Sequence, residues 1–380
     1  MNWPLNVDNF TFLDRLKICS FFLNKNNRWT QGNLVYQFEL KMADFVGAKY
    51  AVYCSSGSTA NTLIAMYLKD TCEKRTVVFP STTWTTSVTP FIREGFSPKF
   101  IDINLQDFSF NYDSLEKFVS ENSNSVALIF ATSLLGFVPD ISRLKTISDK
   151  YGVRIMLDNC ENTFGKFEED NVSSFFTSTT STYFGHHMQS IEGGFVFTNS
   201  KDEYEHFLML RNHGMTRSVV DNKKYLNPDV DSRFDFHYLG NNFRNCEVRA
   251  FIGLLDLAKT DVHVSKRKSL YNIFESEIDH SKYVLPERYE NRDPVPFAFP
   301  IICKEKSYKR IGLEFCDING IETRPIISGN LLRQTCFKKY GTPENFPNSE
   351  FLHHNGFYVG LHTKLKDNQV EHLVDYLNLF

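Results

Sequence analysis

The sequence predicts an α/β protein in which a large, mostly parallel sheet is followed by a smaller α+β unit. Over the first two thirds of the 380 residues, short apolar runs alternate with stretches of helical character. Near residue 255 the pattern changes to charged helical sequence and then to a proline-rich stretch. Brief buried strands separated by helices are typical of βαβ units, whose sheet is covered on both faces. We therefore expect a large domain over residues 1–255 and a small C-terminal domain over residues 256–380.

The expected elements follow in chain order. Residues 50–54 form an apolar and aromatic run that predicts a strand, and residues 58–68 predict the helix after it. Later strands of the large unit are predicted at 76–79, 99–102, 126–131 and 154–157. In the C-terminal unit, residues 254–279 predict a long helical stretch, and residues 297–302 and 321–327 predict strands.

Composition and charge exclude several classes of function. The formal net charge is −3 and no long basic run is present, so nucleic acid is not an expected partner. The N-terminus lacks the basic and then apolar order of a signal peptide. The most apolar long run, residues 126–138, is far shorter than the ~20 residues of a membrane helix. We expect a cytoplasmic protein without membrane contact.

The cysteines give no sign of a metal centre. The chain has eight, and no pair has CxC or CxxC spacing. That distribution supports neither a zinc knuckle nor an iron–sulfur cluster. We expect reduced, mostly buried thiols.

Ligands of open α/β sheets bind at the carboxyl ends of the strands, so the residues after each strand are the candidates for function. Gly57 and Ser58 lie between a strand and a helix, where they predict a phosphate site or, equally, a helix cap. Asp158 ends a buried strand, where it could pair with a protonated pyridine nitrogen or cap a helix. Glu161 could reach the same site. Trp84 could cover a planar ligand or pack in the core.

The segment from Ser181 to Gly194 is the most informative one. It contains His186 and His187, shortly before a Gly-Gly pair. Adjacent histidines can bind a metal, act as general bases or pack in a core. Because no HxH or HxxxH spacing supports a metal, we expect none.

Five segments together resemble the DegT/DnrJ/EryC1/StrS family of pyridoxal-phosphate (PLP) sugar enzymes, which have the aspartate-aminotransferase (type I) fold. In chain order these segments are residues 55–61, 157–161, 181–194, 240–244 and 320–330. In the family's aminotransferases, a lysine before the Gly-Gly pair binds PLP covalently. His186 takes that place here, and histidine cannot form the bond. With the segment 158–161, this implies the sugar 3-dehydratases of the family, in the branch without an iron–sulfur cluster.

The resemblance implies a role for each candidate residue. The backbone amides of Gly57 and Ser58 and the Ser181 hydroxyl would hold the cofactor phosphate. Trp84 would stack on the pyridine ring, Asp158 would pair with its nitrogen, and Glu161 would approach its phenolic oxygen. Asn242 would reach the phosphate in the neighbouring subunit, which makes the expected active unit a homodimer with shared sites. The residues expected to contact substrate are Arg324, Ser328 and Asn330.

The implied reaction removes the C3 hydroxyl of a nucleotide-linked 4-keto-6-deoxyhexose, with GDP-4-keto-6-deoxymannose as the expected substrate. L-glutamate would convert PLP to pyridoxamine phosphate (PMP), and His186 would act as the base. One alternative is an aminotransferase for the same sugar, but Lys145, Lys150 and Lys166 lack the required spacing. The other is a non-catalytic protein of this fold, and the retained candidate residues argue against it.

Overall fold

A seven-stranded sheet forms the centre of the computed structural model, which describes residues 2–379. All of its strands run in one direction except β9, which is antiparallel to both neighbours. The strands, in spatial order, are β1 (Tyr50–Cys54), β9 (Gly194–Thr198), β8 (Ser178–Ser181), β5 (Ile155–Asp158), β4 (Val126–Thr132), β2 (Thr76–Pro80) and β3 (Ser97–Ile101). The predicted α/β fold with a mostly parallel sheet is confirmed.

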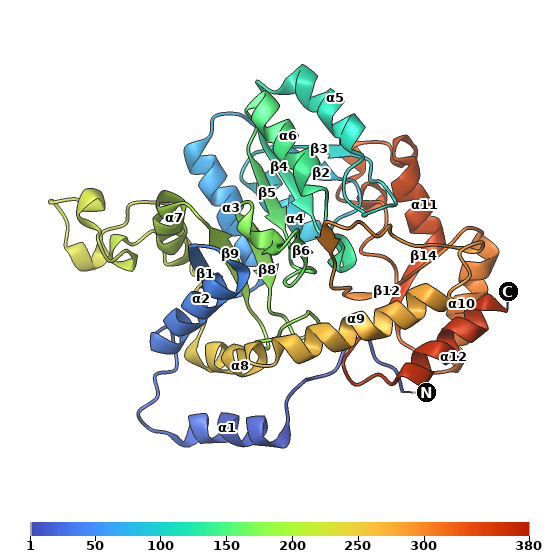
Figure 1. The fold of residues 1–380 in the computed structure, drawn as a ribbon. Helices are drawn as coiled ribbons and strands as arrows, with labels where there is room; N and C mark the ends of the chain where they lie inside the picture. Colours follow the sequence, from blue (N-terminus) through green and yellow to red (C-terminus); the bar gives the residue numbers. More distant parts are fainter. Residues whose placement is uncertain (1, 380) are drawn as a thin grey trace.

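Helices cover both faces of this sheet (Figure 1). One face packs against α3 (Gly57–Thr71), α4 (Thr85–Arg93) and α7 (Lys201–Arg211). The other packs against α2 (Asn33–Val46), α5 (Tyr112–Asn122) and α6 (Ile141–Tyr151). Successive residues of a strand point to opposite faces, and accordingly Val77 and Phe79 lie in one core while Val78 lies in another.

The C-terminal unit is built on a four-stranded antiparallel sheet. Its strands are β10 (Tyr283–Val284), β12 (Ala298–Cys303), β14 (Gly356–Gly360) and β13 (Thr323–Arg324). The remaining helices are α1 (Phe12–Leu23), α8 (Glu247–Leu257), α9 (Thr260–Glu277), α10 (Lys306–Ile318), α11 (Pro347–Asn355) and α12 (Asp367–Asn378). A small third sheet joins β11 (Arg292–Asp293) to β6 (Lys166–Phe167) and β7 (Asp170–Asn171), and so connects the two units.

Most predicted elements lie where the sequence placed them, with three differences. The pair β8 and β9 was not predicted, because β8 consists of Ser and Thr and lacks an apolar signature. The predicted helical stretch 254–279 is divided between α8 and α9. The predicted strand 321–327 is reduced to β13, and the chain then turns through Ser328 and Gly329, which have φ of 62° and 60°. The predicted domain boundary after residue 255 falls inside α8, and the division into two domains stays a prediction.

The N-terminal segment packs with the C-terminal unit (Figure 1). Trp3 is 0% exposed, and its indole nitrogen donates to the Gly360 carbonyl at 2.8 Å. Its ring lies edge-on to Phe299, with 6.1 Å between ring centroids. The two ends of the sequence therefore share one core.

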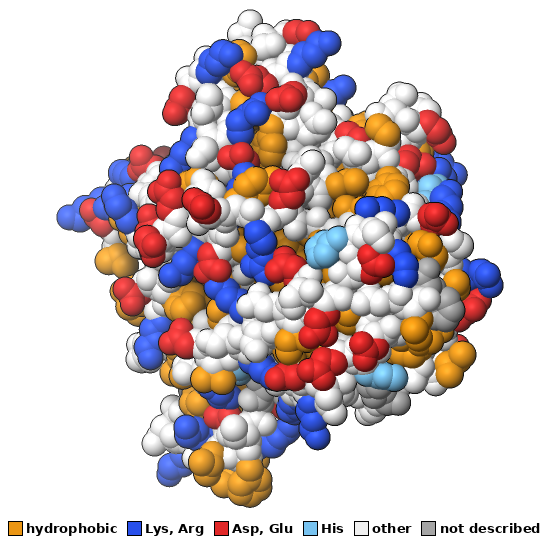
Figure 2. Space-filling view, turned by 45° about the vertical axis from the view of Figure 1, so that its right-hand side comes forward, with side chains coloured by type: hydrophobic (Ala, Val, Ile, Leu, Met, Phe, Trp, Pro, Cys, Tyr) orange, Lys and Arg blue, Asp and Glu red, His pale blue; other side chains and the backbone are white. Residues whose placement is uncertain are grey.

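Several surface properties bear on possible partners. Within residues 2–379, no helix combines the length and the apolar composition needed to cross a membrane. Hydrophobic side chains gather at the lower end of the molecule in Figure 2, where α1 lies in Figure 1. The exposed apolar residues of α1 are Phe12, Leu13, Leu16, Phe22 and Leu23. All eight cysteines are free thiols, but only Cys54, Cys303 and Cys316 are fully buried, so the expected burial holds in part.

Trp3→Ala should destabilise the protein, because it removes a buried ring and its hydrogen bond from the shared core. We expect a loss of roughly 3 to 5 kcal/mol in the free energy of unfolding, measured by urea denaturation of the apoprotein. Trp29, which is 56% exposed, provides the matched control, and Trp29→Ala should cost clearly less. Equal losses would contradict the role given to Trp3.

Candidate active site

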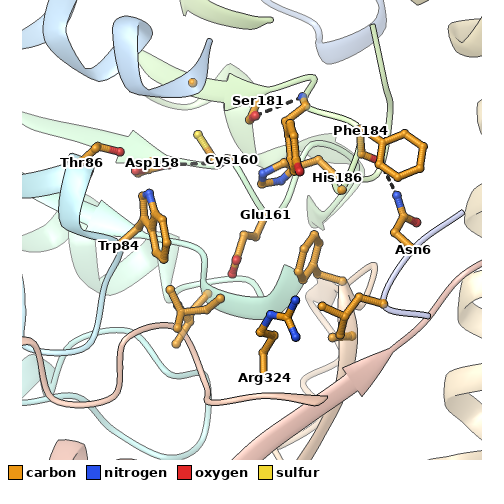
Figure 3. A pocket seen from close by; sticks show the side chains of 18 of the residues that line it. Asn6, Trp84, Thr86, Asp158, Cys160, Glu161, Ser181, Phe184, His186 and Arg324 are labelled. Atoms are coloured by element: carbon orange, nitrogen blue, oxygen red, sulfur yellow. Dashed lines mark hydrogen bonds between the residues drawn. The ribbon is translucent and has the colours of Figure 1, made fainter. Parts of the chain in front are cut away.

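The carboxyl ends of the parallel strands open onto a cavity of about 580 Å³. Strand register decides which residues meet there: Asp158 pairs with Thr132 on one side and with Thr179 on the other. Because β9 is reversed, its first residue, Gly194, lies beside Ser181 at the same edge. Figure 3 shows the labelled side chains arranged around this cavity, from segments far apart in the sequence.

A cradle for an anion lies at the N-terminus of α3. Ser56 is the N-cap, and its hydroxyl accepts from the Thr59 amide at 3.1 Å. First-turn amides have no partner within their helix, which leaves those of Gly57 and Ser58 for a ligand. A Cβ atom at Gly57 would lie 2.8 Å from the Cys160 sulfur and 2.9 Å from Cβ of Ser181, so glycine permits this close approach. The cap and the cradle are therefore formed by successive residues and do not exclude each other.

Asp158 is held at the floor of the cavity by three donors. It is 4% exposed, and its Oδ2 accepts from Asn61 Nδ2 at 2.8 Å and from the Ser87 hydroxyl at 2.6 Å. Its Oδ1 accepts from the Cys160 amide at 3.0 Å. Thr179 donates to Oδ1 of Asn61 at 2.6 Å and so orients that amide. A carboxylate has about four acceptor sites, which leaves Asp158 able to accept from a cationic N–H in the cavity.

Trp84 and Glu161 both line the cavity (Figure 3). Trp84 is 52% exposed, so it is free to cover a ligand and the alternative of core packing is excluded. Glu161 Oε2 accepts from the Leu135 amide at 2.7 Å. Burial raises the pKa of Glu161 to about 8, the charge of Asp158 acts in the same direction, and the Leu135 hydrogen bond opposes both. Glu161 is therefore mostly protonated at neutral pH and can donate a hydrogen bond.

His186 lines the cavity within the loop between β8 and β9. Its ring lies 5.4 Å from that of Phe297, and its Nδ1 is buried without a hydrogen-bond partner among residues 2–379. Burial lowers its pKa to about 4, opposed by the Cys160 backbone and the Asp158 carboxylate, while the Arg267 cation adds to the lowering. The imidazole is thus neutral at pH 7 and able to accept a proton.

The neighbouring His187 has a different environment. It is 1% exposed and its ring stacks on Phe164, with 5.5 Å between centroids and 16° between planes. It is not among the residues that line the cavity. Of the adjacent pair, only His186 faces the cavity, and His187 packs in the interior.

The cavity wall, as described for residues 2–379, contains no lysine. Among the described residues, His186 lines this cavity and no lysine amino group reaches it. This agrees with the expectation from sequence spacing.

The structure leaves three of the predicted site residues outside this cavity. Asn242 is exposed and accepts from Arg244 Nε at 2.9 Å. Asn330 is 0% exposed, and its Nδ2 donates to Glu350 at 2.9 Å and to the Pro343 carbonyl at 3.1 Å. Ser328 lies in the turn after β13 and does not line the cavity. Asn330 thus has a structural role, which the motif by itself did not reveal. Of the three residues expected to contact substrate, Arg324 does line the cavity.

Sequence reasoning missed several residues in and around the site. Asn61 and Ser87 orient Asp158, and Leu5 and Asn6 line the cavity from the N-terminal segment. Asn61 could have been found, since it ends the segment that follows the first strand. Ser87 and the N-terminal residues carry no local signal, because only the tertiary structure brings them to this edge.

These groups fit a planar, anionic cofactor with a protonated ring nitrogen. The cradle at Gly57 suits a phosphate, Asp158 suits the ring nitrogen, and the exposed indole of Trp84 suits the ring face. Among residues 2–379, no group of three or more His, Cys, Asp or Glu side chains is placed to hold a metal ion. The donor set is that of a PLP site.

Comparison with known proteins agrees with this geometry. The description of the matching family model is "DegT/DnrJ/EryC1/StrS aminotransferase family", and the match covers residues 22–378. The GDP-4-keto-6-deoxy-D-mannose 3-dehydratase of Escherichia coli O55:H7 is 29% identical over 392 aligned positions, covering 99% of this chain and 100% of that relative.

Two solved structures are similar over nearly their whole length. The E. coli GDP-4-keto-6-deoxy-D-mannose-3-dehydratase with bound hydrated PLP has a TM-score of 0.91 at 29% identity, with 99% of each chain covered. A GDP-4-keto-6-deoxymannose-3-dehydratase with a trapped PLP-glutamate geminal diamine has a TM-score of 0.90 at 28% identity, covering 99% of this chain and 100% of the other.

Glu161→Gln should change the pH dependence of stability. Because the pKa of Glu161 rises from 4.5 to about 8 on folding, the folded protein retains a proton that the unfolded chain releases. The unfolding free energy of the apoprotein should therefore fall between these pH values, by roughly 4 to 5 kcal/mol. Glu161→Gln should remove this part of the fall, measured by urea denaturation from pH 4.5 to 8.5. The control is Glu169→Gln, at an exposed carboxylate; parallel curves for all three proteins would contradict the buried proton.

Proposed function

This chain belongs to the DegT/DnrJ/EryC1/StrS aminotransferase family, and from that membership we propose that it is a 3-dehydratase of a nucleotide-linked 4-keto-6-deoxyhexose. The cofactor is PLP, which alternates with PMP. The proposed substrate is GDP-4-keto-6-deoxymannose, the amino donor is L-glutamate, and the product is a deoxysugar. The dehydratases reported above support this choice of nucleotide and sugar.

One observation carries the proposal. His186 lines the cavity, and no lysine of the described chain does; by the family resemblance, His186 would stand in the place of the aminotransferase lysine. An aminotransferase needs that amine to hold and release its cofactor. A buried neutral imidazole can instead move a proton without forming a covalent bond. A non-catalytic protein of this fold is less well supported, because Asp158, Trp84 and Ser181 all remain placed around the cavity.

Each residue of the site has a separate role toward the cofactor. When bound, the cofactor supplies an amine for the sugar's keto carbon and a ring that accepts electrons. Gly57, Ser58 and Ser181 hold its phosphate. Asp158, kept in place by Asn61 and Ser87, holds a proton on the ring nitrogen. Protonated Glu161 donates to the phenolic oxygen.

His186 moves the proton on which the elimination depends. Its neutral ring accepts the proton from the carbon that carries the amine, and loss of the C3 hydroxyl of the sugar follows. The hydroxyl would leave as water, and hydrolysis would then release ammonia and the 4-keto-3,6-dideoxy product, which leaves the cofactor without its amine. L-glutamate then restores the amine, and the relative with a trapped PLP-glutamate geminal diamine supports this choice of donor.

The proposed active unit is a cytoplasmic homodimer in which Asn242 of one chain reaches the phosphate in the other. Asn242 is exposed and lies outside the cavity of its own chain. The exposed apolar side chains of α1 support an interface with a second copy, because such a cluster is unfavourable in water.

His186→Lys should abolish dehydration, because lysine removes the imidazole that moves the proton. Purified protein with PLP and L-glutamate is incubated with GDP-, CDP- and UDP-linked 4-keto-6-deoxy sugars, and ammonia release is followed. We expect activity with the GDP sugar and a loss of at least ~100-fold in the variant. His280→Asn, at an exposed histidine outside the cavity, is the control.

Borohydride reduction gives a second measurement for the same variants, because it fixes any covalent link between PLP and a lysine. The PLP that the denatured protein retains is then measured by absorbance. The parent protein should release all its PLP after reduction and denaturation, whereas His186→Lys should retain some covalently. Retained dehydration in His186→Lys, or a reducible lysine in the parent protein, would refute the assignment.

Asn242→Ala should weaken PLP binding roughly tenfold, because one hydrogen bond to the phosphate is lost. Gly57→Ala should also weaken it, since the added Cβ lies 2.8 Å from the Cys160 sulfur. Mixed dimers of the two variants test the shared site. If Asn242 acts across the interface, mixing should restore tight binding at one site per dimer, measured by equilibrium dialysis. No recovery would place Asn242 outside the partner's phosphate site.

A further inference from the structure

The N-terminal segment forms part of the cavity wall and contacts two other segments of that wall. Leu5 and Asn6 line the cavity together with Phe184, Glu322 and Arg324. On one side, the Leu5 amide donates to Glu322 Oε2 at 3.1 Å. On the other side, Asn6 Nδ2 donates to the Phe184 carbonyl, as the dashed line in Figure 3 shows. Residues 5 and 6 therefore join the C-terminal unit to the loop that carries His186.

This segment is fixed in position without any help from Asn6. The Trp3 amide donates to the Gly320 carbonyl at 3.1 Å, and the Glu322 amide donates to the Trp3 carbonyl at 2.9 Å. A Cβ atom at Gly360 would lie 2.4 Å from the Leu5 carbonyl oxygen, so the chain passes very close to β14 here. Removal of the Asn6 amide should therefore leave the anchor intact and release only the loop.

Phe184 lies inside the turn that places His186. The His186 amide donates to the Tyr183 carbonyl at 2.9 Å, and the Phe184 amide donates to Ile191 at 3.0 Å. The Tyr183 ring also meets the His186 ring edge-on, with 6.0 Å between centroids. Tyr183 and Phe184 are 47% and 38% exposed, so packing holds this turn weakly. A hydrogen bond from Asn6 to the Phe184 carbonyl therefore restricts the turn from outside.

Glu322 links the same segment to Arg324. Its Oε1 accepts from Arg324 Nη2 at 2.6 Å, while its Oε2 accepts from Leu5. Both side chains are about half exposed, at 50% for Arg324 and 42% for Glu322, so the ion pair is open to an incoming anion. A diphosphate at Arg324 would compete for the guanidinium. Glu322 would then have Leu5 as its remaining partner, and the contact to the N-terminal segment would strengthen.

We propose that residues 5 and 6 couple diphosphate binding at Arg324 to the position of His186. Asn6 is a positioning residue that acts on His186 through Phe184. Glu322 connects the two sites, because it bonds Arg324 and the Leu5 amide and loses the first contact when an anion binds Arg324. Because binding free energies are reciprocal, an ordered loop also favours diphosphate binding. The identity of the ligand, a nucleoside diphosphate, rests on the proposed function, whereas the contacts do not.

Hydrogen–deuterium exchange of residues 182–193 tests this coupling, with the PLP-loaded full chain and GDP as the probe. In the parent protein, GDP should slow exchange in this segment. Asn6→Ala should raise exchange without GDP by roughly tenfold, as for loss of one hydrogen bond, and should abolish the slowing by GDP. Asn2→Ala, an exposed asparagine of the same segment, is the control and should behave like the parent. Asn6→Gln keeps an amide donor and should recover part of the protection.

Steady-state kinetics separate positioning from a merely structural role. Asn6→Ala should lower kcat for dehydration roughly tenfold, because the base is misplaced, and should leave KM for L-glutamate unchanged. Equal exchange and equal slowing by GDP in the parent and in Asn6→Ala would overturn the coupling. Failure of the parent to bind GDP would instead overturn the nucleotide assigned under the proposed function. The exchange rates of the parent and of Asn6→Ala without GDP would still show whether Asn6 restricts the loop.

Discussion

The close approach of three backbone segments at one edge of the sheet is the constraint on which the site depends. A Cβ atom at Gly194 would lie 2.5 Å from the Gly57 nitrogen, and one at Gly57 would touch Cys160 and Ser181. Only glycine at both positions lets the start of α3 meet the end of β8 and the start of β9. The amides at the start of α3 then face the same cavity as Asp158, and an anionic group and a ring nitrogen can be held at once.

Burial sets the protonation of the acid and the base in this cavity, with opposite signs. Removal from water disfavours the charged form, so the pKa of Glu161 rises to about 8 and that of His186 falls to about 4. At neutral pH one group is a neutral acid and the other a neutral base. Asp158 is also buried, but three donors surround it. A neutral donor, a neutral acceptor and a hydrogen-bonded carboxylate therefore line one cavity.

The C-terminal unit contributes a side chain to the cavity and also holds the N-terminal segment in place beside it. Arg324 comes from strand β13 of its sheet. At Gly360 of the same sheet, the N-terminal segment passes close to the backbone. The buried indole of Trp3 makes that passage stable, because it connects the start of the chain to a core formed mainly by its last hundred residues. Through Leu5 and Asn6, the segment that carries Glu322 and Arg324 contacts the loop that carries His186.

Local sequence was sufficient to predict strands β1 to β5, the turn at Gly57 and the carboxylate that ends β5, because strand and turn propensities act over a few residues. The resemblance to the DegT/DnrJ/EryC1/StrS family, and not the local pattern, singled out His186 as the residue in the place of the aminotransferase lysine. Local sequence could not show β8, whose hydroxyl side chains resemble a loop, nor that Asn330 is buried while Asn6 lines the cavity. Those outcomes depend on contacts between residues far apart in the chain, such as Asn61 with Asp158 or Trp3 with Gly360. Only the packed tertiary structure decides such contacts, because burial and hydrogen-bond partners arise from neighbours in space.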